Sequence, residues 1–165
     1  MPERETVERA KEQAREGKAP TTQAGEFVRE EMRHIRKGKH GARSTKQAIA
    51  IGLSKARRAG VKLRPPKKGA ASERTRRSAQ TALRRGRRGG KVSLTRSRAV
   101  HGALRRESRS AASRRSLARQ AQAAARRRGA RARSAAAQKA VRTKGPRVRV
   151  AAARKAAHTR ARRTR

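Results

Sequence analysis

The sequence has no cysteine, tryptophan or tyrosine, and its one aromatic residue is Phe27. Without cysteine there is no disulfide framework, no thiolate metal site and no thiol nucleophile. Without aromatics there is no large anchor for a core and no platform on which single-stranded bases could stack. Most of the apolar fraction of 33% is alanine. We therefore expect that the chain buries too little apolar surface to order most of its length.

Acidic residues are also scarce, and their positions argue against an enzyme. The chain has ten acids against 51 lysines and arginines, and only Glu73 and Glu107 follow residue 31. General acid–base chemistry needs titratable groups held in a packed site, and arginine cannot exchange a proton usefully at neutral pH. No serine has a histidine and an acid arranged beside it. The sequence therefore predicts a protein without catalytic residues.

Long apolar runs are absent as well. No stretch approaches the roughly 18–20 apolar residues that a membrane span requires, and no such run follows the polar residues at the N-terminus, as it would in a secretory signal. The tail also lacks an amphipathic face with large apolar residues, so a membrane partner is the weakest of the alternatives. We expect a cytoplasmic location.

What the chain has in abundance is positive charge. Its formal net charge is +41. Residues 1–31 hold eight of the ten acids and net −2, so residues 32–165 net +43. A region of that charge repels itself in water and needs an abundant polyanion as its partner, which in a cell means DNA or RNA.

The residues preceding position 65 divide into a polar leader and a helical hairpin. Residues 1–20 are the leader, in which Glu and Arg or Lys pairs could support a frayed helix that ends at Gly17 and Pro20. A first helix is expected over residues 23–37, capped by Thr21 or Thr22 and stopped by Gly38. Its apolar stripe consists of Phe27, Val28, Met32 and Ile35.

A second helix begins at a capping box, Ser44-Thr45-Lys46-Gln47. One face of this helix carries Ala48, Ile49, Gly52, Leu53, Ala56 and Ala59, and its small residues would let another helix approach closely. Gly60 is placed for a left-handed cap, with Val61 packing back onto the helix. The two helices form a marginal αα-hairpin over residues 21–64, through which a homodimer is one possibility.

Residues 65–165 are a low-complexity tail of Arg, Ala, Ser and Gly. The predicted fold class is therefore mostly α: a small hairpin followed by a long, largely disordered tail. Ala and Arg are good helix formers, so part of the tail, above all residues 97–128, is expected to become helical once phosphates neutralise its arginines.

The candidate nucleic-acid-binding residues lie in one loop and in a series of basic pairs and triplets. The loop of residues 38–45 enters a helix N-terminus, where Lys39, Arg43, Ser44 and Lys46 could clamp a phosphate, although an ordinary helix connection explains the same residues. Its spacing is not that of a nucleotide-binding P-loop. The arginine fork suits bidentate phosphate contact. The remaining candidates are Arg57, Arg58, Lys67, Lys68, Arg84, Arg85, Arg87, Arg88, Arg105, Arg106, Arg114, Arg115, Arg126, Arg127, Arg128, Arg162 and Arg163.

The four histidines, His34, His40, His101 and His158, raise the question of a metal. Their spacing fits no known ligand set, and carboxylates are missing nearby except around His34. The sequence therefore predicts no metal site and no cofactor.

Two resemblances extend these predictions. Lys46-Gln47-Ala48-Ile49-Ala50-Ile51-Gly52-Leu53-Ser54, with the preceding residues from Glu26 to Gly41, resembles the recurring run of a small bacterial family of uncharacterised domain proteins. This resemblance spans residues 23–64 and implies no activity. The tail is similar in composition to the C-terminal domains of linker histones and to bacterial histone-like proteins, although it is rich in Arg rather than Lys and lacks Ser-Pro repeats.

These observations predict a histone-like, nucleoid-associated protein that neutralises and compacts duplex DNA without reading its sequence. Base readout needs a rigid element that presents chosen side chains, which the tail does not offer. The main alternative is an RNA-binding or ribosome-associated basic protein, whose composition would be the same. A third possibility is that the acidic residues 1–31 shield the tail or recruit an assembly partner.

Overall fold

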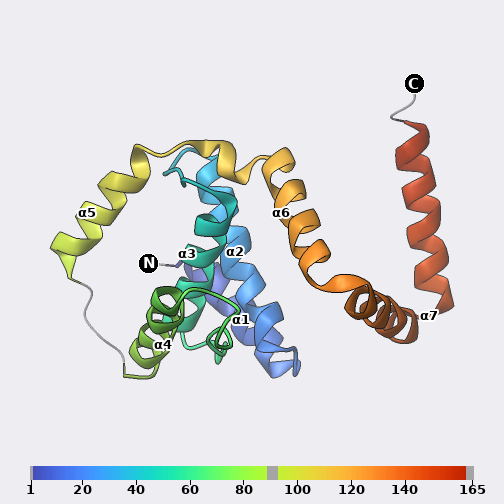
Figure 1. Cartoon of the computed structure of the whole chain (residues 1–165), viewed down its shortest axis with the longest axis horizontal. Helices are drawn as coiled ribbons and strands as arrows, with labels where there is room; N and C mark the ends of the chain where they lie inside the picture. Colours follow the sequence, from blue (N-terminus) through green and yellow to red (C-terminus); the bar gives the residue numbers. More distant parts are fainter. Residues whose placement is uncertain (1, 89–92, 163–165) are drawn as a thin grey trace. The chain divides into compact units, whose positions relative to one another are not determined.

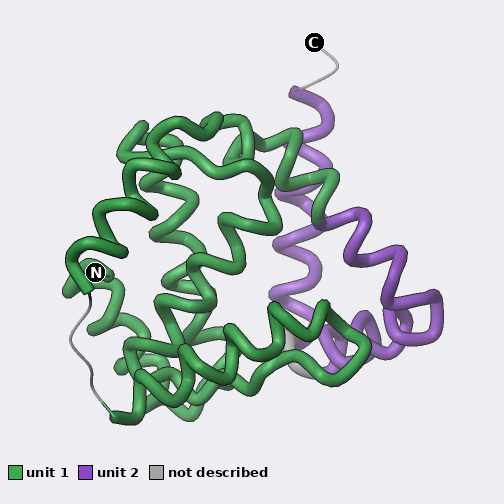
Figure 2. Tube along the Cα trace, turned by 60° about the vertical axis from the view of Figure 1, so that its left-hand side comes forward, with its two compact units in different colours: residues 1–120 green, residues 121–165 purple. Residues whose placement is uncertain are grey.

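The computed structural model describes residues 2–88 and 93–162, and in those residues it contains seven α-helices and one short 3-10 helix (Figure 1). The chain divides into two compact units, residues 1–120 and residues 121–165 (Figure 2). The elements in chain order are α1 (Arg4–Arg15), α2 (Pro20–Arg36), α3 (Thr45–Arg58), α4 (Glu73–Arg88), α5 (Leu94–Arg105), η1 (Arg109–Ala112), α6 (Arg114–Arg127) and α7 (Gly129–Ala161).

The two predicted helices of the hairpin are present, and α3 has the predicted ends. The Ser44 hydroxyl accepts a hydrogen bond from the Gln47 amide at 3.2 Å, and the Gln47 side chain accepts one from the Arg43 amide. Gly60 has a φ of 94°, and the Val61 amide bonds back to the carbonyl of Ala56. That pattern of a left-handed glycine and a returning amide is the Schellman cap. The first helix starts earlier than predicted, at Pro20, which occupies a first-turn position where its missing N–H is not needed. The predicted cap at Thr21 or Thr22 is therefore wrong, because both residues lie inside α2 and the N-cap position is Ala19.

Small residues on α3 let it lie close to α2. A Cβ placed on Gly52 would stand 2.8 Å from the Cα of Val28, a distance that real Cβ atoms do not tolerate. Ala48 and Ala56, one turn to either side of Gly52, are fully buried. The predicted interpretation of this face as a close helix contact is therefore confirmed.

The core between these helices is split into two small clusters. One consists of Ala10, Ala24, Phe27, Ala56 and Val61, with Leu53 and Leu63 at its edge. The other consists of Met32, Ile35, Ala42, Ala48, Ala111 and Ala112, with Ile49 and Leu117 at its edge. Ala10 belongs to α1, so the N-terminal leader is a helix that packs on α2 and completes the first cluster.

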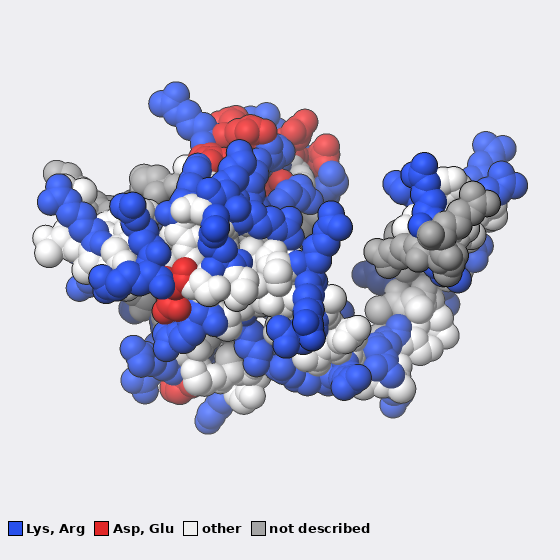
Figure 3. Space-filling view, turned by 90° about the horizontal axis from the view of Figure 1, so that it is seen from above, with Lys and Arg blue, Asp and Glu red and all other residues white. Residues whose placement is uncertain are grey.

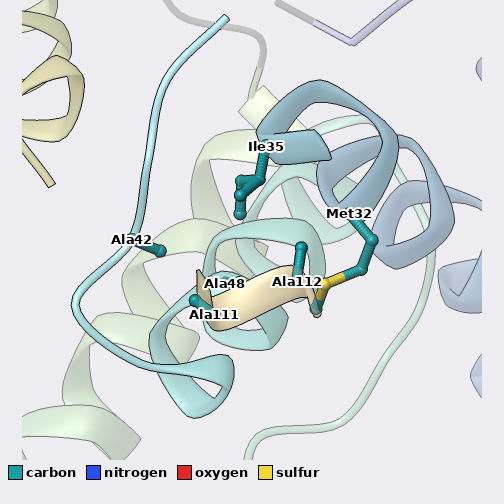
Figure 4. Packing of buried hydrophobic residues seen from close by; sticks show 6 residues of the cluster. All are labelled: Met32, Ile35, Ala42, Ala48, Ala111 and Ala112. Carbon is teal, nitrogen blue, oxygen red and sulfur yellow. The ribbon is translucent and has the colours of Figure 1, made fainter. Parts of the chain in front are cut away.

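The second cluster is completed by residues from the segment expected to be a tail. Ala111 and Ala112 lie beside Met32 and Ile35 in Figure 4. Hydrogen bonds fix the segment in place: the Thr45 hydroxyl donates to the carbonyl of Ala111 at 2.7 Å, and Arg36 donates to that of Ala112 at 2.9 Å. The amides of the loop at Gly41 and Ala42 donate to the carbonyls of Leu104 and Ser108.

The prediction of a small hairpin followed by a long, largely disordered tail is therefore wrong. Helix α4 packs on α3 through Ala79 and Ala82, and the segment of residues 104–112 packs on the loop between α2 and α3. The prediction of disorder assumed that only large apolar side chains can form a core. Here alanines that face helices at close range supply the contacts instead, because a short side chain suffices where backbones approach closely.

In residues 121–162 the chain is almost entirely helical and has no core. None of the side chains described in residues 121–162 is buried. Glycines divide the helical segments: Gly129 has a φ of 73°, and Gly145, which precedes Pro146, breaks α7 with a φ of 64°. Repulsion between like charges one turn apart costs only a few tenths of a kcal/mol per pair. The helix propensity of Ala and Arg outweighs it, which is the physical reason that the segment is not disordered.

No helix in the described part of the chain is long and apolar enough to cross a membrane.

Candidate nucleic-acid interface

Most of the basic residues predicted to bind nucleic acid are exposed. This holds for Lys39, Arg43, Lys46, Arg58, Lys67, Lys68, Arg84, Arg85, Arg87, Arg88, Arg105, Arg106, Arg114, Arg115, Arg126, Arg127, Arg128 and Arg162, and also for Ser44. Arg163 lies outside the described residues. Lys and Arg side chains cover much of the face shown in Figure 3, and most of the acidic side chains visible there gather in one group.

Arg57 is the exception among the predicted residues. Only 6% of it is exposed. Its guanidinium donates to the carbonyls of Leu63 at 3.2 Å and Arg64 at 3.4 Å, so it holds the segment that follows α3. Burial lowers its pKa from the usual value. Arg57 is therefore placed to stabilise the fold rather than to meet a phosphate.

The helices α3 and α4 enclose a shallow groove of about 250 Å³ that suits an anion. Its lining consists of Ser54, Arg58, Ser78, Thr81, Ala82 and Arg85, which gives two guanidinium groups and three hydroxyls without an acid. Partial burial and the positive charge of Arg85 lower the pKa of Arg58. The Arg58 side chain is steadied by a hydrogen bond from its Nε to the carbonyl of Ser54 at 3.3 Å. A phosphate in this groove would relieve the repulsion between the two arginines.

The groove forms because α4 lies against the end of α3. A Cβ on Gly86 would stand 2.0 Å from the carbonyl oxygen of Arg57, so only glycine permits this approach. That contact brings Arg85, one residue before Gly86, next to Arg58. Sequence reasoning identified both arginines as members of separate basic pairs but had no signal that they share one groove.

The loop between α2 and α3 is more constrained than a free phosphate clamp would be. Its amides at Gly41 and Ala42 are taken by carbonyls of residues 104–108. The Lys39 ammonium lies 3.2 Å from Oε1 of Glu3, so its charge is already paired. Arg43 and Lys46 remain exposed at the start of α3. The clamp of Lys39, Arg43, Ser44 and Lys46 therefore stays a prediction.

The acids that sequence reasoning grouped with the first 31 residues are largely folded into ion pairs. Glu26 is buried and accepts hydrogen bonds from Arg9, Gln13 and Arg29. Glu3 accepts hydrogen bonds from His34 and Lys39, which lower its pKa to about 2; its other oxygen accepts from Arg33. These carboxylates fasten α1 to α2.

A second group of acids and histidines lies between α2, α3 and the loop. Glu30 and Glu31 are both essentially inaccessible, and His34 and His40 are each 8% exposed. The Lys55 ammonium lies 2.7 Å from Oε2 of Glu31 and 3.4 Å from Oε1 of Glu30. Oε1 of Glu31 lies 3.3 Å from Nε2 of His40.

This cluster was missed at the level of sequence. The two histidines are six residues apart, across a glycine turn, so their spacing alone did not bring them together. A signal does exist: Glu31 and His34 are separated by three residues, which places both on one face of α2. The fold adds His40, because Gly38, with a φ of 76°, turns the chain back over the end of the helix.

Comparison with known proteins gives one family match, over the hairpin and the residues just after it, and no function. Residues 21–68 match a family of unknown function (DUF6496). The match agrees with the resemblance of the hairpin to an uncharacterised family, and it does not extend to the basic helices after residue 68. No curated protein and no solved structure matches the chain.

Proposed function

We propose that the chain is a binding protein rather than an enzyme, and that it neutralises and compacts duplex DNA without sequence preference. It would act as a histone-like protein in the cytoplasm, at the nucleoid. The observation that carries the proposal is the separation of the two signs of charge. Residues 32–165 net +43, and those of their predicted contact residues that the structure describes are exposed except for Arg57.

The acids of the chain support the same proposal, because many of them are used internally. Glu26, Glu30 and Glu31 are buried, and Glu3 is surrounded by cations. Carboxylates that are held in ion pairs do not cancel the field of the exposed arginines. An approaching phosphate backbone would therefore meet a mostly positive surface over residues 32–162, while Glu5, Glu8, Glu12 and Glu16 stay exposed in the first 31 residues.

The helical state of residues 114–161 suits a duplex better than a single strand. Basic side chains on a helix are held at fixed intervals, and binding to phosphates then requires less ordering of the backbone than binding by a disordered tail. Among aromatic residues only Phe27 is available, and it is buried, so bases have no stacking platform. RNA binding is the alternative that the same positive charge would serve. Competition between duplex DNA and RNA for the protein distinguishes the two. The homodimer through residues 21–64 stays a prediction.

The salt dependence of binding tests this function. If ten phosphates are contacted, the logarithm of the binding constant should fall with the logarithm of salt concentration at a slope of roughly −9. Fluorescence anisotropy with a labelled duplex, measured in a series of salt concentrations, gives that slope. Two unrelated duplexes should give the same slope and affinity. A binding constant that does not change with salt would contradict the proposal.

Within this interface, the groove of Arg58 and Arg85 is expected to contribute one phosphate contact. Replacement of both arginines by glutamine should make the salt slope less steep by about one or two. A matched control is the double replacement of Arg105 and Arg106 by glutamine, which removes two charges outside the groove. If the groove binds a phosphate specifically, the variant without Arg58 and Arg85 should lose more DNA affinity at fixed salt than the variant without Arg105 and Arg106.

A further inference from the structure

Glu31, His34 and His40 form a cluster that the proposed function does not use. One carboxylate oxygen of Glu31 and one ring nitrogen of each histidine all lie within 4.8 Å of one another, and all three residues are buried. Two imidazoles and one carboxylate are a ligand set used by divalent transition metal ions. Glu31 and His34 come from one face of α2, and His40 comes from the loop that follows it.

The carboxylate of Glu31 is buried without a hydrogen-bond donor. Glu31 has no exposed surface, and neither of its oxygens accepts a hydrogen bond from any described residue. Lys55 and His40 lie at ion-pair distance from these oxygens without forming a hydrogen bond of ordinary geometry. An ionised carboxylate removed from water is destabilising unless both of its oxygens have partners. A cation bound at Oε1 would satisfy it, while Oε2 faces the Lys55 ammonium.

Each histidine has its other nitrogen fixed by a neighbouring acceptor. Nδ1 of His40 lies 3.0 Å from the carbonyl oxygen of Gly41, and Nε2 of His34 lies 2.7 Å from Oε1 of Glu3. A carbonyl and an ionised carboxylate only accept, so these two nitrogens carry the protons. The opposite nitrogens, Nε2 of His40 and Nδ1 of His34, then present lone pairs. A second partner that orients the imidazole is the usual companion of a metal-binding histidine.

One ligand distance and the nearby charges also fit a small tetrahedral ion. Two ligands at about 2.0–2.1 Å from a tetrahedral Zn²⁺ stand about 3.3–3.4 Å apart, and Nε2 of His40 is 3.3 Å from Oε1 of Glu31. Glu30 and Glu31 together carry two negative charges against the one ammonium of Lys55. Glu3, which contacts His34, is itself paired with Arg33 and Lys39. Glu31 therefore has one cation beside it, the Lys55 ammonium, which it shares with Glu30.

We propose that Glu31, His34 and His40 bind a divalent transition metal ion of the zinc class, which fastens the loop of residues 38–44 to α2. The role is structural. The loop in turn holds residues 104–112 through the Gly41 and Ala42 amides, so the ion would stabilise the contact between the hairpin and the following segment. This inference does not depend on DNA binding.

The test uses the full-length chain, stripped of metal by a chelator and dialysed. Zn²⁺ is titrated in competition with a chromophoric chelator, and Co²⁺ is used as a spectroscopic probe. We expect one equivalent of Zn²⁺, an intense visible Co²⁺ spectrum typical of a tetrahedral site, and a higher Tm in the presence of Zn²⁺. The variants Glu31→Gln and His40→Gln should each bind Zn²⁺ at least tenfold more weakly. The matched control His158→Gln, which alters an exposed histidine on α7, should bind as the parent does.

Several outcomes would overturn the proposal. The parent could fail to bind Zn²⁺, or all three variants could bind it equally, which would assign any binding to other groups. If His40→Gln loses helical signal by circular dichroism, X-ray absorption at the Zn edge of the parent decides instead. Two histidine ligands and oxygen ligands support the site, whereas a shell of oxygens alone contradicts it. An absence of metal would leave Lys55 as the cation that pairs with Glu31.

Discussion

Gly52 on α3 lies directly against Val28 on α2, so closely that a Cβ added at Gly52 would stand 2.8 Å from the Cα of Val28 and 3.0 Å from its Cγ2. The atom nearest to the added methyl group is backbone and cannot rotate away. The contact is therefore possible only for glycine, and it sets the spacing of the two helices around which the unit of residues 1–120 is built.

The substitution Gly52→Ala should lower the free energy of unfolding by about 1–3 kcal/mol, because overpacking forces the helices apart. Gly102→Ala is a matched control: it also lies inside a helix, but nothing stands within 4 Å of its added Cβ. There the gain in helix propensity should stabilise the protein by up to about 1 kcal/mol. Urea unfolding followed by far-ultraviolet circular dichroism measures both. Equal stability of the two variants would contradict the close contact.

Arg57 and Arg87 should separate stability from binding. Arg57→Ala removes a buried guanidinium that donates to two carbonyls, and it should cost about 1–3 kcal/mol of stability. Where the variant is folded, its affinity for DNA should be unchanged. Arg87→Ala, at an exposed position on α4, should leave stability within about 0.5 kcal/mol and make the salt slope less steep by about one.

That pair of substitutions is informative because the alternative predicts the reverse pattern. If Arg57 contacted phosphates, as its position beside Arg58 in the sequence predicts, its replacement would weaken DNA binding at unchanged stability. Urea unfolding and anisotropy titrations of the same two variants distinguish the cases.

Amide exchange in the DNA-free protein should show that the region following the hairpin is folded before it meets DNA. The amides of Gly41 and Ala42 donate to the carbonyls of Leu104 and Ser108, so their exchange should be slowed relative to an unstructured peptide. Hydrogen exchange measured by NMR resolves both residues. Exchange at the rate of a free peptide would mean that residues 104–108 are not packed on the loop. It would contradict the folded state described for this segment.

Truncation after Gln120 should remove much positive charge but should lower the thermal stability of the remaining chain only slightly. No side chain described in residues 121–162 is buried, so the Tm of the shortened chain should stay within a few degrees of the parent. Residues 121–165 hold 16 of the 51 basic residues and none of the acids, so the salt slope of DNA binding should become clearly less steep. A large loss of Tm would show that these residues contribute packing to the remainder of the chain.

The hairpin could be predicted from the sequence because its signals are local. The Ser44 hydroxyl caps α3 by accepting from the Gln47 amide. Gly60 ends the helix with a positive φ, a backbone conformation that favours glycine. The buried Phe27 and Ile35 follow the helical period. Each of these depends on residues within one or two turns. Physical rules about such short distances are strong enough to fix where a helix starts and ends.

The packing of the following segment could not be predicted, because it rests on alanines far away in the sequence. Ala112 is fully buried against Met32 and Ile35, some 80 residues earlier, yet nothing distinguishes it from the many exposed alanines around it. The groove of Arg58 and Arg85 and the cluster of Glu31 and His40 have the same origin. The groove depends on the close contact of Gly86 with Arg57, and the cluster depends on the turn at Gly38, which brings His40 to α2.

The central claim is that the chain binds duplex DNA through its phosphates, and competition tests it most directly. Labelled duplex bound to the full-length protein is challenged with the same duplex, an unrelated duplex, structured RNA and single-stranded DNA of equal phosphate content. The account predicts that both duplexes displace the label equally, and that RNA and single strands displace it less. Stronger displacement by RNA would contradict it and move the protein to an RNA-containing particle.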